Sequence, residues 1–202
     1  MTQAQVKFNS FEEYLSYSDE TPMEGRYELI DGALVELPPE SEPNNWIALN
    51  LRDYLIQVVS RRLVRVHALE LQVPVLQPRD AANRYPDLVV LRPEHLQLTQ
   101  RRLTITLDMP PPRLIVEVVS PGKTNQDRDY VHKRAQYAAI GVPEYWLIDP
   151  VAQTVMVLTL EGEAYREVGV FGNQATLAES CHQEITSIEF ADLNLTVGQI
   201  FE

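Results

Sequence analysis

Two acidic residues lie in segments whose other residues are typical of buried strands. Asp87 lies in residues 85–91, and Glu117 lies in residues 114–120. Both segments are short, apolar and rich in β-branched residues, as in strands that are covered on both faces. A carboxylate in such a segment is unfavourable unless it is paired, hydrogen-bonded or bound to a cation. The two acids are therefore the first candidates for chemistry.

A lysine follows on the next predicted helix. Asp129, Lys133 and Tyr137 are spaced by four residues, which places them on one helix face. Two carboxylates and a lysine are the side chains that metal-assisted phosphodiester hydrolysis requires. A hard cation such as Mg²⁺ (or Mn²⁺) prefers oxygen ligands and keeps several waters, so Asp87 and Glu117 are sufficient protein ligands. Lys133 is then placed to orient water or to stabilise developing negative charge.

Each of these residues also has a structural interpretation. Asp87 could bond a loop amide at the entry to its strand. Glu117 could form a buried salt bridge with an arginine. Lys133 could form an i,i+4 pair with Asp129 on a solvated helix face, where such a pair contributes about 0.2–0.5 kcal/mol.

Glu28 is a further candidate, as a third acid that assists at the metal. It lies on the first predicted hairpin strand, and spacing alone favours a solvent-facing glutamate there. The histidines show no metal-ligand spacing and are interpreted as structural; they are His67, His95, His132 and His182.

Composition sets the wider limits. The chain of 202 residues is expected to form a single domain, residues 1–202, and its one cysteine, Cys181, excludes an internal disulfide. No apolar segment has membrane-spanning length, so we expect a cytoplasmic protein without a membrane partner. The net charge is −12, yet residues 52–134 hold 14 basic and 9 acidic side chains. This excess of five positive charges could form a solvated face or follow a phosphate backbone.

The elements that must position these residues are those of an α/β domain. Helical periodicity predicts helices near residues 10–17, 44–59 and 126–140. Gly141 and Pro143 are expected to end the last of these helices. Alternating or continuous apolar residues predict hairpins at 27–37 and 154–168 and strands near 63–67, 69–75, 85–91, 114–120 and 144–148.

Several motifs also resemble a known family. They are YELIDG at 27–32, YPDLVV at 85–90, LIVEVVSP at 114–121, the Asp129, Lys133 and Tyr137 set, and GVPEYWLIDP at 141–150. Together, over residues 11–157, they resemble the Uma-type family of restriction-endonuclease-like proteins in the PD-(D/E)xK nuclease superfamily. The resemblance implies a mixed central sheet flanked by helices, with additional β-hairpins, and divalent-metal-dependent DNA cleavage.

The resemblance assigns Asp87 and Glu117 to metal ligation, and Glu28 to a recurrent acid of the first motif. The superfamily's usual lysine, two residues after the glutamate, is Val119 here. In this family the lysine has moved to the helix, where Lys133 matches it. Asn45 stands where many relatives carry a histidine.

The function expected is that of a Mg²⁺- or Mn²⁺-dependent DNA endonuclease, with DNA as partner and a homodimer as a compatible assembly. The alternative is a catalytically inactive nuclease fold that serves as a binding or assembly module. The acidic net charge and Val119 favour this alternative. A glycosidase with two catalytic carboxylates is a third, weaker interpretation, because no aromatic sugar platform accompanies the acids.

Overall fold

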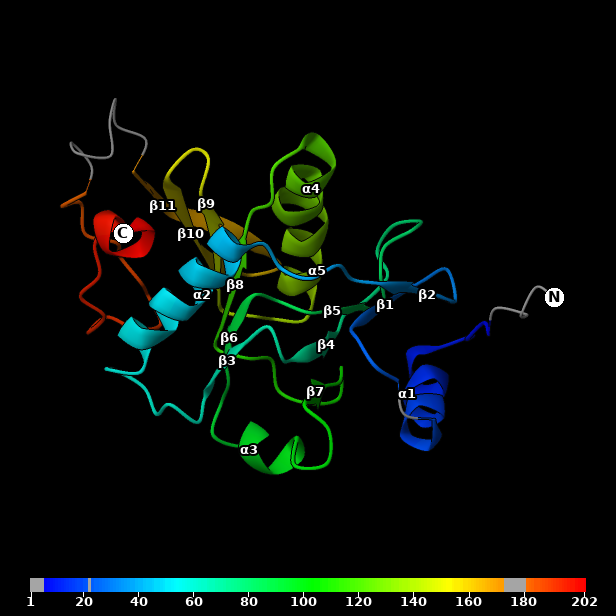
Figure 1. The fold of residues 1–202 in the computed structure, drawn as a ribbon. Helices are drawn as coiled ribbons and strands as arrows, with labels where there is room; N and C mark the ends of the chain where they lie inside the picture. The colour runs from blue at the N-terminus through cyan, green and yellow to red at the C-terminus, as the bar shows by residue number, and fades with distance from the viewer. Residues whose placement is uncertain (1–5, 22, 173–180) are drawn as a thin grey trace.

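The computed structural model describes residues 6–21, 23–172 and 181–202 and is built around a six-stranded mixed sheet (Figure 1). The strand order is β11-β10-β9-β8-β6-β3, in which β8 and β9 are parallel and the other neighbours antiparallel. The strands are β3 (Val64–Val66), β6 (Leu88–Val90), β8 (Leu114–Val118), β9 (Glu144–Asp149), β10 (Thr154–Glu161) and β11 (Ala164–Gly172).

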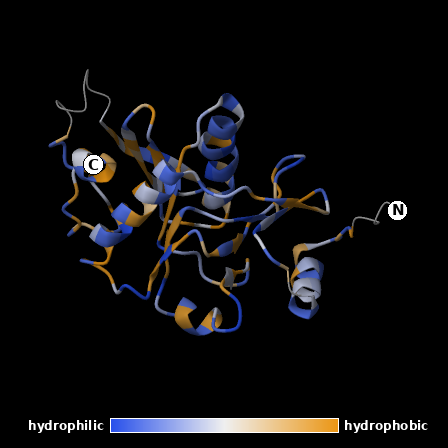
Figure 2. Cartoon of the chain, viewed as in Figure 1, coloured by the Kyte–Doolittle hydropathy of each residue, from blue (hydrophilic) through white to orange (hydrophobic). Residues whose placement is uncertain are grey.

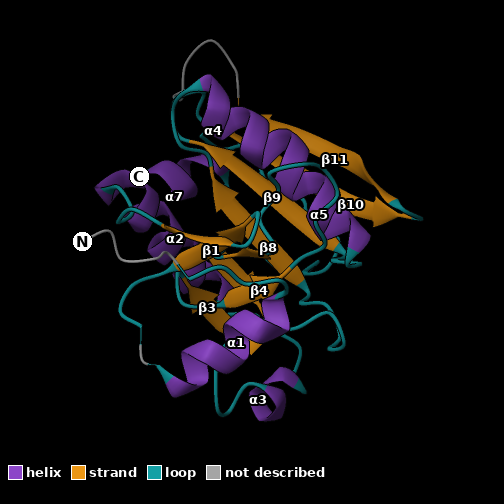
Figure 3. Ribbon diagram, turned by 90° about the vertical axis from the view of Figure 1, so that its right-hand side faces the viewer, coloured by secondary structure: helices purple, strands orange, loops and turns teal. Residues whose placement is uncertain are grey.

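The central strands form the core because both of their faces are covered. Every residue of β6, β8 and β9 is buried. Helix α2 (Glu42–Leu55) covers one face, and the continuous helix that contains α4 and α5 covers the other (Figures 1 and 3). Hydrophobic residues concentrate along these strands, whereas the outer helix surfaces are more polar (Figure 2). The predicted mixed sheet with flanking helices is confirmed.

A smaller layer lies beside the main sheet. The predicted first hairpin is confirmed as β1 (Tyr27–Ile30) and β2 (Ala33–Glu36), joined through Asp31 and Gly32, both with positive φ. A three-stranded sheet follows, with β5 (Asn83–Arg84), β4 (Glu70–Gln72) and β7 (Thr104–Ile105) in that order. Helix α1 (Phe11–Glu20) packs here through its own apolar cluster with Leu29.

The helix after β8 differs from the prediction in one respect. It begins at α4 (Lys123–Asp127), passes through a π-helical segment η1 (Arg128–Lys133) and continues as α5 (Arg134–Ala139). The wider π turn takes in one extra residue, which changes the direction in which the following side chains leave the helix, and such segments are frequent at functional sites. Gly141, with φ +82°, ends the helix as expected.

Two short helices complete the described elements, α3 (His95–Leu98) and α7 (Val197–Phe201). Within the described ranges, no helix combines the length and apolar character that crossing a bilayer requires.

Candidate active site

The four residues selected from the sequence line one pocket of about 230 Å³. Glu28 comes from β1, Asp87 directly precedes β6, Glu117 lies near the end of β8, and Lys133 ends η1. The pairing of β6 with β8 makes the two acid-bearing strands neighbours. Residues far apart in the chain therefore meet at one end of the inner strands β6 and β8.

Asp87 is fixed to both strands that flank β6. Its Oδ2 accepts a hydrogen bond of 2.6 Å from the backbone amide of Val118 on β8. Its backbone oxygen accepts one of 3.0 Å from the amide of His67, just after β3. The amide-bonding interpretation of Asp87 thus holds, although the amide belongs to a neighbouring strand. The second carboxylate oxygen, Oδ1, is turned toward His67.

Glu117 is more deeply enclosed than Asp87 or Glu28, with 2% of its surface exposed. Its Oε2 accepts from Lys133 Nζ at 2.7 Å, and its Oε1 accepts from the Tyr137 hydroxyl at 2.6 Å. The buried salt bridge that the sequence suggested is present, but its partner is a lysine and not an arginine. Burial raises the pKa of Glu117 to about 8, since the opposing charge of Lys133 offsets burial only in part and Asp87 adds to the rise.

Lys133 forms the predicted i,i+4 pair with Asp129, at 2.9 Å. The expectation of a solvated helix face is wrong, because only 6% of Lys133 is exposed and Asp129 is also buried. This face of the helix packs onto the end of β8, where Lys133 bridges Asp129 and Glu117. Burial lowers the pKa of Lys133, but the charges of Glu117 and Asp129 raise it more, so the ammonium form is retained.

Glu28 is buried, which makes the solvent-facing interpretation wrong. Its Oε2 accepts from Arg84 Nη1 at 3.0 Å, and Arg84 in turn donates from Nε to Gln136 on α5 at 2.9 Å. Hairpin β1–β2 is thereby tied to the helix that carries Lys133. Arg128, which lines the same pocket, donates to Asp129 at 3.2 Å and keeps 38% of its side chain exposed.

The structure adds two residues that the sequence analysis did not select. Glu40 and His67 each place a potential ligand atom beside Asp87, such that the three atoms lie within 4.8 Å of one another. Their positions, 27 and 20 residues apart, follow no metal-binding spacing. Only the unusual burial of Asp87 could have directed attention to its neighbours. His67 had been interpreted as structural.

The donor set fits a divalent cation. A carboxylate has about four lone-pair positions, and hydrogen bonds from the described residues use one on Asp87 and two on Glu117. The buried charges also leave room for a cation. With every group ionised, four carboxylates face three basic groups here, namely Glu28, Asp87, Glu117 and Asp129 against Arg84, Arg128 and Lys133, and a bound cation would favour the ionised form of Glu117. Oxygen ligands and a net negative charge are what Mg²⁺ and Mn²⁺ prefer.

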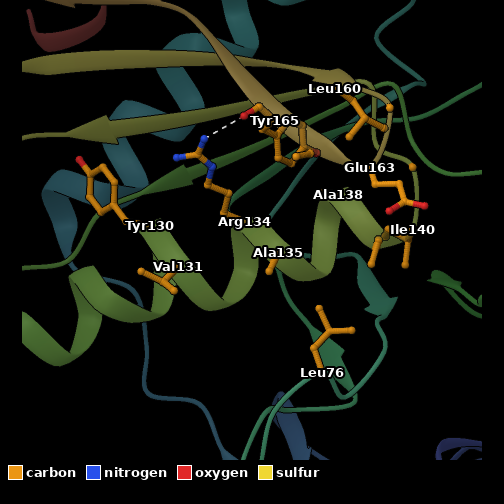
Figure 4. Close-up of a pocket in the computed structure, with 14 residues that line it drawn as sticks. Leu76, Tyr130, Val131, Arg134, Ala135, Ala138, Ile140, Leu160, Glu163 and Tyr165 are labelled. Carbon is orange, nitrogen blue, oxygen red and sulfur yellow. Dashed lines mark hydrogen bonds between the residues drawn. The ribbon is translucent and has the colours of Figure 1, made fainter.

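A larger pocket of about 890 Å³ lies on another face of the same helix, against the β10–β11 hairpin (Figure 4). Its wall is largely apolar, with Val131, Ala135 and Ala138 from the helix. Figure 4 shows Arg134 directed to the hairpin, where it donates to the Tyr165 backbone oxygen at 3.0 Å. Among the described residues that line it, Glu163 carries the one carboxylate, so this lining lacks the paired acids that the chemistry requires.

Comparisons with known proteins agree with the sequence and the fold. The profile of the Uma2 family, described as "Putative restriction endonuclease", matches residues 11–195. Among solved structures, the chain is similar to a "putative nuclease belonging to DUF820" from Anabaena variabilis ATCC 29413. The TM-score is 0.61 and the identity 21%, over 94% of this chain and 96% of that chain, which confirms the predicted fold class. No curated protein matches the chain.

Proposed function

Since this chain belongs to the Uma2 family of nuclease-like proteins, we propose that it hydrolyses phosphodiester bonds of DNA as a divalent-metal-dependent endonuclease. The observation that carries the proposal is the meeting of Asp87, Glu117 and Lys133 at one pocket. Buried acids and a buried lysine are unfavourable for stability unless they are well paired, so their concentration beside a cavity supports a functional role.

In the proposed reaction, Asp87 and Glu117 would hold Mg²⁺ or Mn²⁺, which when bound would supply charge neutralisation at the phosphate and a water of lowered pKa. Lys133 offers a fixed ammonium that orients water or stabilises negative charge as it develops. Tyr137 holds Glu117 in place through its hydrogen bond, and Asp129 holds Lys133 through the ion pair described above.

Two further residues shape the pocket. Arg128 lies at its partly exposed side, where a guanidinium suits a DNA phosphate. Glu28 assists from β1 by fixing Arg84, and its carboxylate adds negative charge beside the cation position.

One observation favours the alternative, a binding or assembly module without catalysis. Both oxygens of Glu117 already accept hydrogen bonds, from Lys133 and Tyr137, which satisfies this carboxylate without a metal. An inactive nuclease fold would retain such a pair for stability alone.

Cleavage of supercoiled plasmid separates the two functions. The wild-type protein should nick it with Mg²⁺ or Mn²⁺ and not with EDTA, and Asp87→Asn should lower the rate by about 10²–10³ or more. Asp127→Asn is the matched control, because it makes the same change at an exposed position on α4 and should cleave normally. A wild-type protein that binds duplex DNA but cleaves with neither ion would support the module.

A further inference from the structure

The side of Asp87 that faces away from the Val118 amide has the features of a metal site containing nitrogen. Glu40, His67 and Asp87 come from three separate segments, yet one ligand atom of each lies within 4.8 Å of the others. Ligands at about 2.0–2.2 Å from one ion are separated by at most about 4.4 Å. Small side-chain adjustments would therefore bring the three atoms around a common cation.

The imidazole of His67 is the decisive component. Both of its ring nitrogens are buried, and neither forms a hydrogen bond with any described residue. Nδ1 lies 3.3 Å from Asp87 Oδ1, but without the geometry of a hydrogen bond. Leaving a buried polar group unpaired costs about 1–3 kcal/mol, so such groups usually have a partner. A metal ion between the ring and the carboxylates would provide that partner.

The surrounding groups fix the carboxylates of Asp87 and Glu40 and leave one oxygen of each available to bind a metal ion. The Val118 amide holds Asp87 by Oδ2, which leaves Oδ1. Arg26 holds Glu40 by Oε1 at 2.8 Å, and Oε2 accepts no hydrogen bond from the described residues. Arg26 also approaches the His67 backbone oxygen, at 3.5 Å. Outer groups that orient ligands in this way are a regular component of metal sites.

We propose that Glu40, His67 and Asp87 bind a divalent transition-metal ion such as Mn²⁺ through one nitrogen and two oxygens. Imidazole is a better ligand for such ions than for Mg²⁺, whose preferred ligands are all oxygens. The proposal rests on the proposed function in that it shares Asp87 with the nuclease site, and it names the ligands and the metal on the side of Asp87 that faces His67. Its ligand set, however, can be tested without DNA and without turnover.

The test is pulsed EPR of Mn²⁺ added to the metal-free protein. In the wild type, bound Mn²⁺ should show coupling to an imidazole nitrogen. In His67→Asn this coupling should be lost, and the Kd for Mn²⁺ should rise at least about tenfold. Asn suits the backbone of residue 67, whose φ is +53°, so the variant is expected to fold.

His132→Asn is the matched control, since His132 also faces a carboxylate, that of Asp80 at 2.8 Å, outside the pocket. It should retain the nitrogen coupling. Glu40→Gln should weaken Mn²⁺ binding while keeping the coupling. Wild-type protein that binds no Mn²⁺, or His67→Asn that binds it with unchanged affinity and coupling, would overturn the proposal. Nitrogen-coordinated Mn²⁺ without DNA cleavage would instead refute only the proposed nuclease activity.

Discussion

Lys133→Met is the most severe test of the buried ion pairs that Lys133 forms with Glu117 and Asp129. Lys133 is buried, and its ammonium lies 2.7 Å from Glu117 and 2.9 Å from Asp129. Methionine preserves most of the side-chain volume but removes the positive charge. Two buried carboxylates then lose their shared partner, although Arg128 remains beside Asp129.

Removing one partner of a buried ion pair costs about 3–5 kcal/mol. The raised pKa of Glu117 allows it to take up a proton when Lys133 is absent. We therefore expect the free energy of unfolding to fall by an amount near the lower limit, about 3 kcal/mol. For a domain of this size, that loss corresponds to a fall in Tm of about 6–12 °C. Losing an exposed i,i+4 pair would lower Tm by at most about 2 °C.

The assay is urea unfolding of wild type, Lys133→Met, Glu117→Gln and the double variant. Because each single change leaves the other group without its partner, the double variant should lose less free energy than the two singles combined, by about 1 kcal/mol or more. Additive losses, or a cost of Lys133→Met below about 1 kcal/mol, would refute the buried pair. Cleavage by Lys133→Met should fall by about 10²–10³ at temperatures where the variant is folded.

Two other predictions concern residues away from the pocket. Glu144→Gln should lower the free energy of unfolding by about 3 kcal/mol, because the Glu144 carboxylate accepts four hydrogen bonds, two of them from the backbone amides of Ile188 and Glu189. A loss below about 1 kcal/mol in urea unfolding would contradict this. Burial lowers the pKa of His95, so the unfolded state binds more protons and stability should decline as pH falls below about 6.5. In His95→Asn, the Tm measured by thermal unfolding should fall less between pH 7.5 and pH 5 than in the wild type. An equal fall in Tm would show that other groups cause the pH dependence.

The elements of the fold were largely predictable, because periodicity reports local structure. The β1–β2 hairpin and its Asp31-Gly32 turn, the buried acid-bearing strands and the stop at Gly141 are all confirmed. The π-helical segment was not predictable, since a helical pattern of apolar residues does not show where one extra residue enters a turn.

A residue of the candidate site could be predicted only where its side chain differs in polarity from the rest of its segment. Glu117 could be selected because a carboxylate interrupts an apolar strand. The burial of Lys133 could not be foreseen, because helical spacing defines a face without showing what covers it. His67 and Glu40 give no sequence signal at all, since their meeting with Asp87 depends on how three distant segments pack.

The location of a bound metal ion tests the central claim most directly. A crystal of the wild-type protein grown with Mn²⁺ should show an anomalous difference peak at coordination distance, about 2–2.6 Å, from the Asp87 carboxylate. The peak should lie in the pocket that Glu117 and Lys133 also line. An ordered Mn²⁺ found only elsewhere, or no peak at a concentration that supports cleavage, would contradict the assignment of this pocket as the metal-dependent active site.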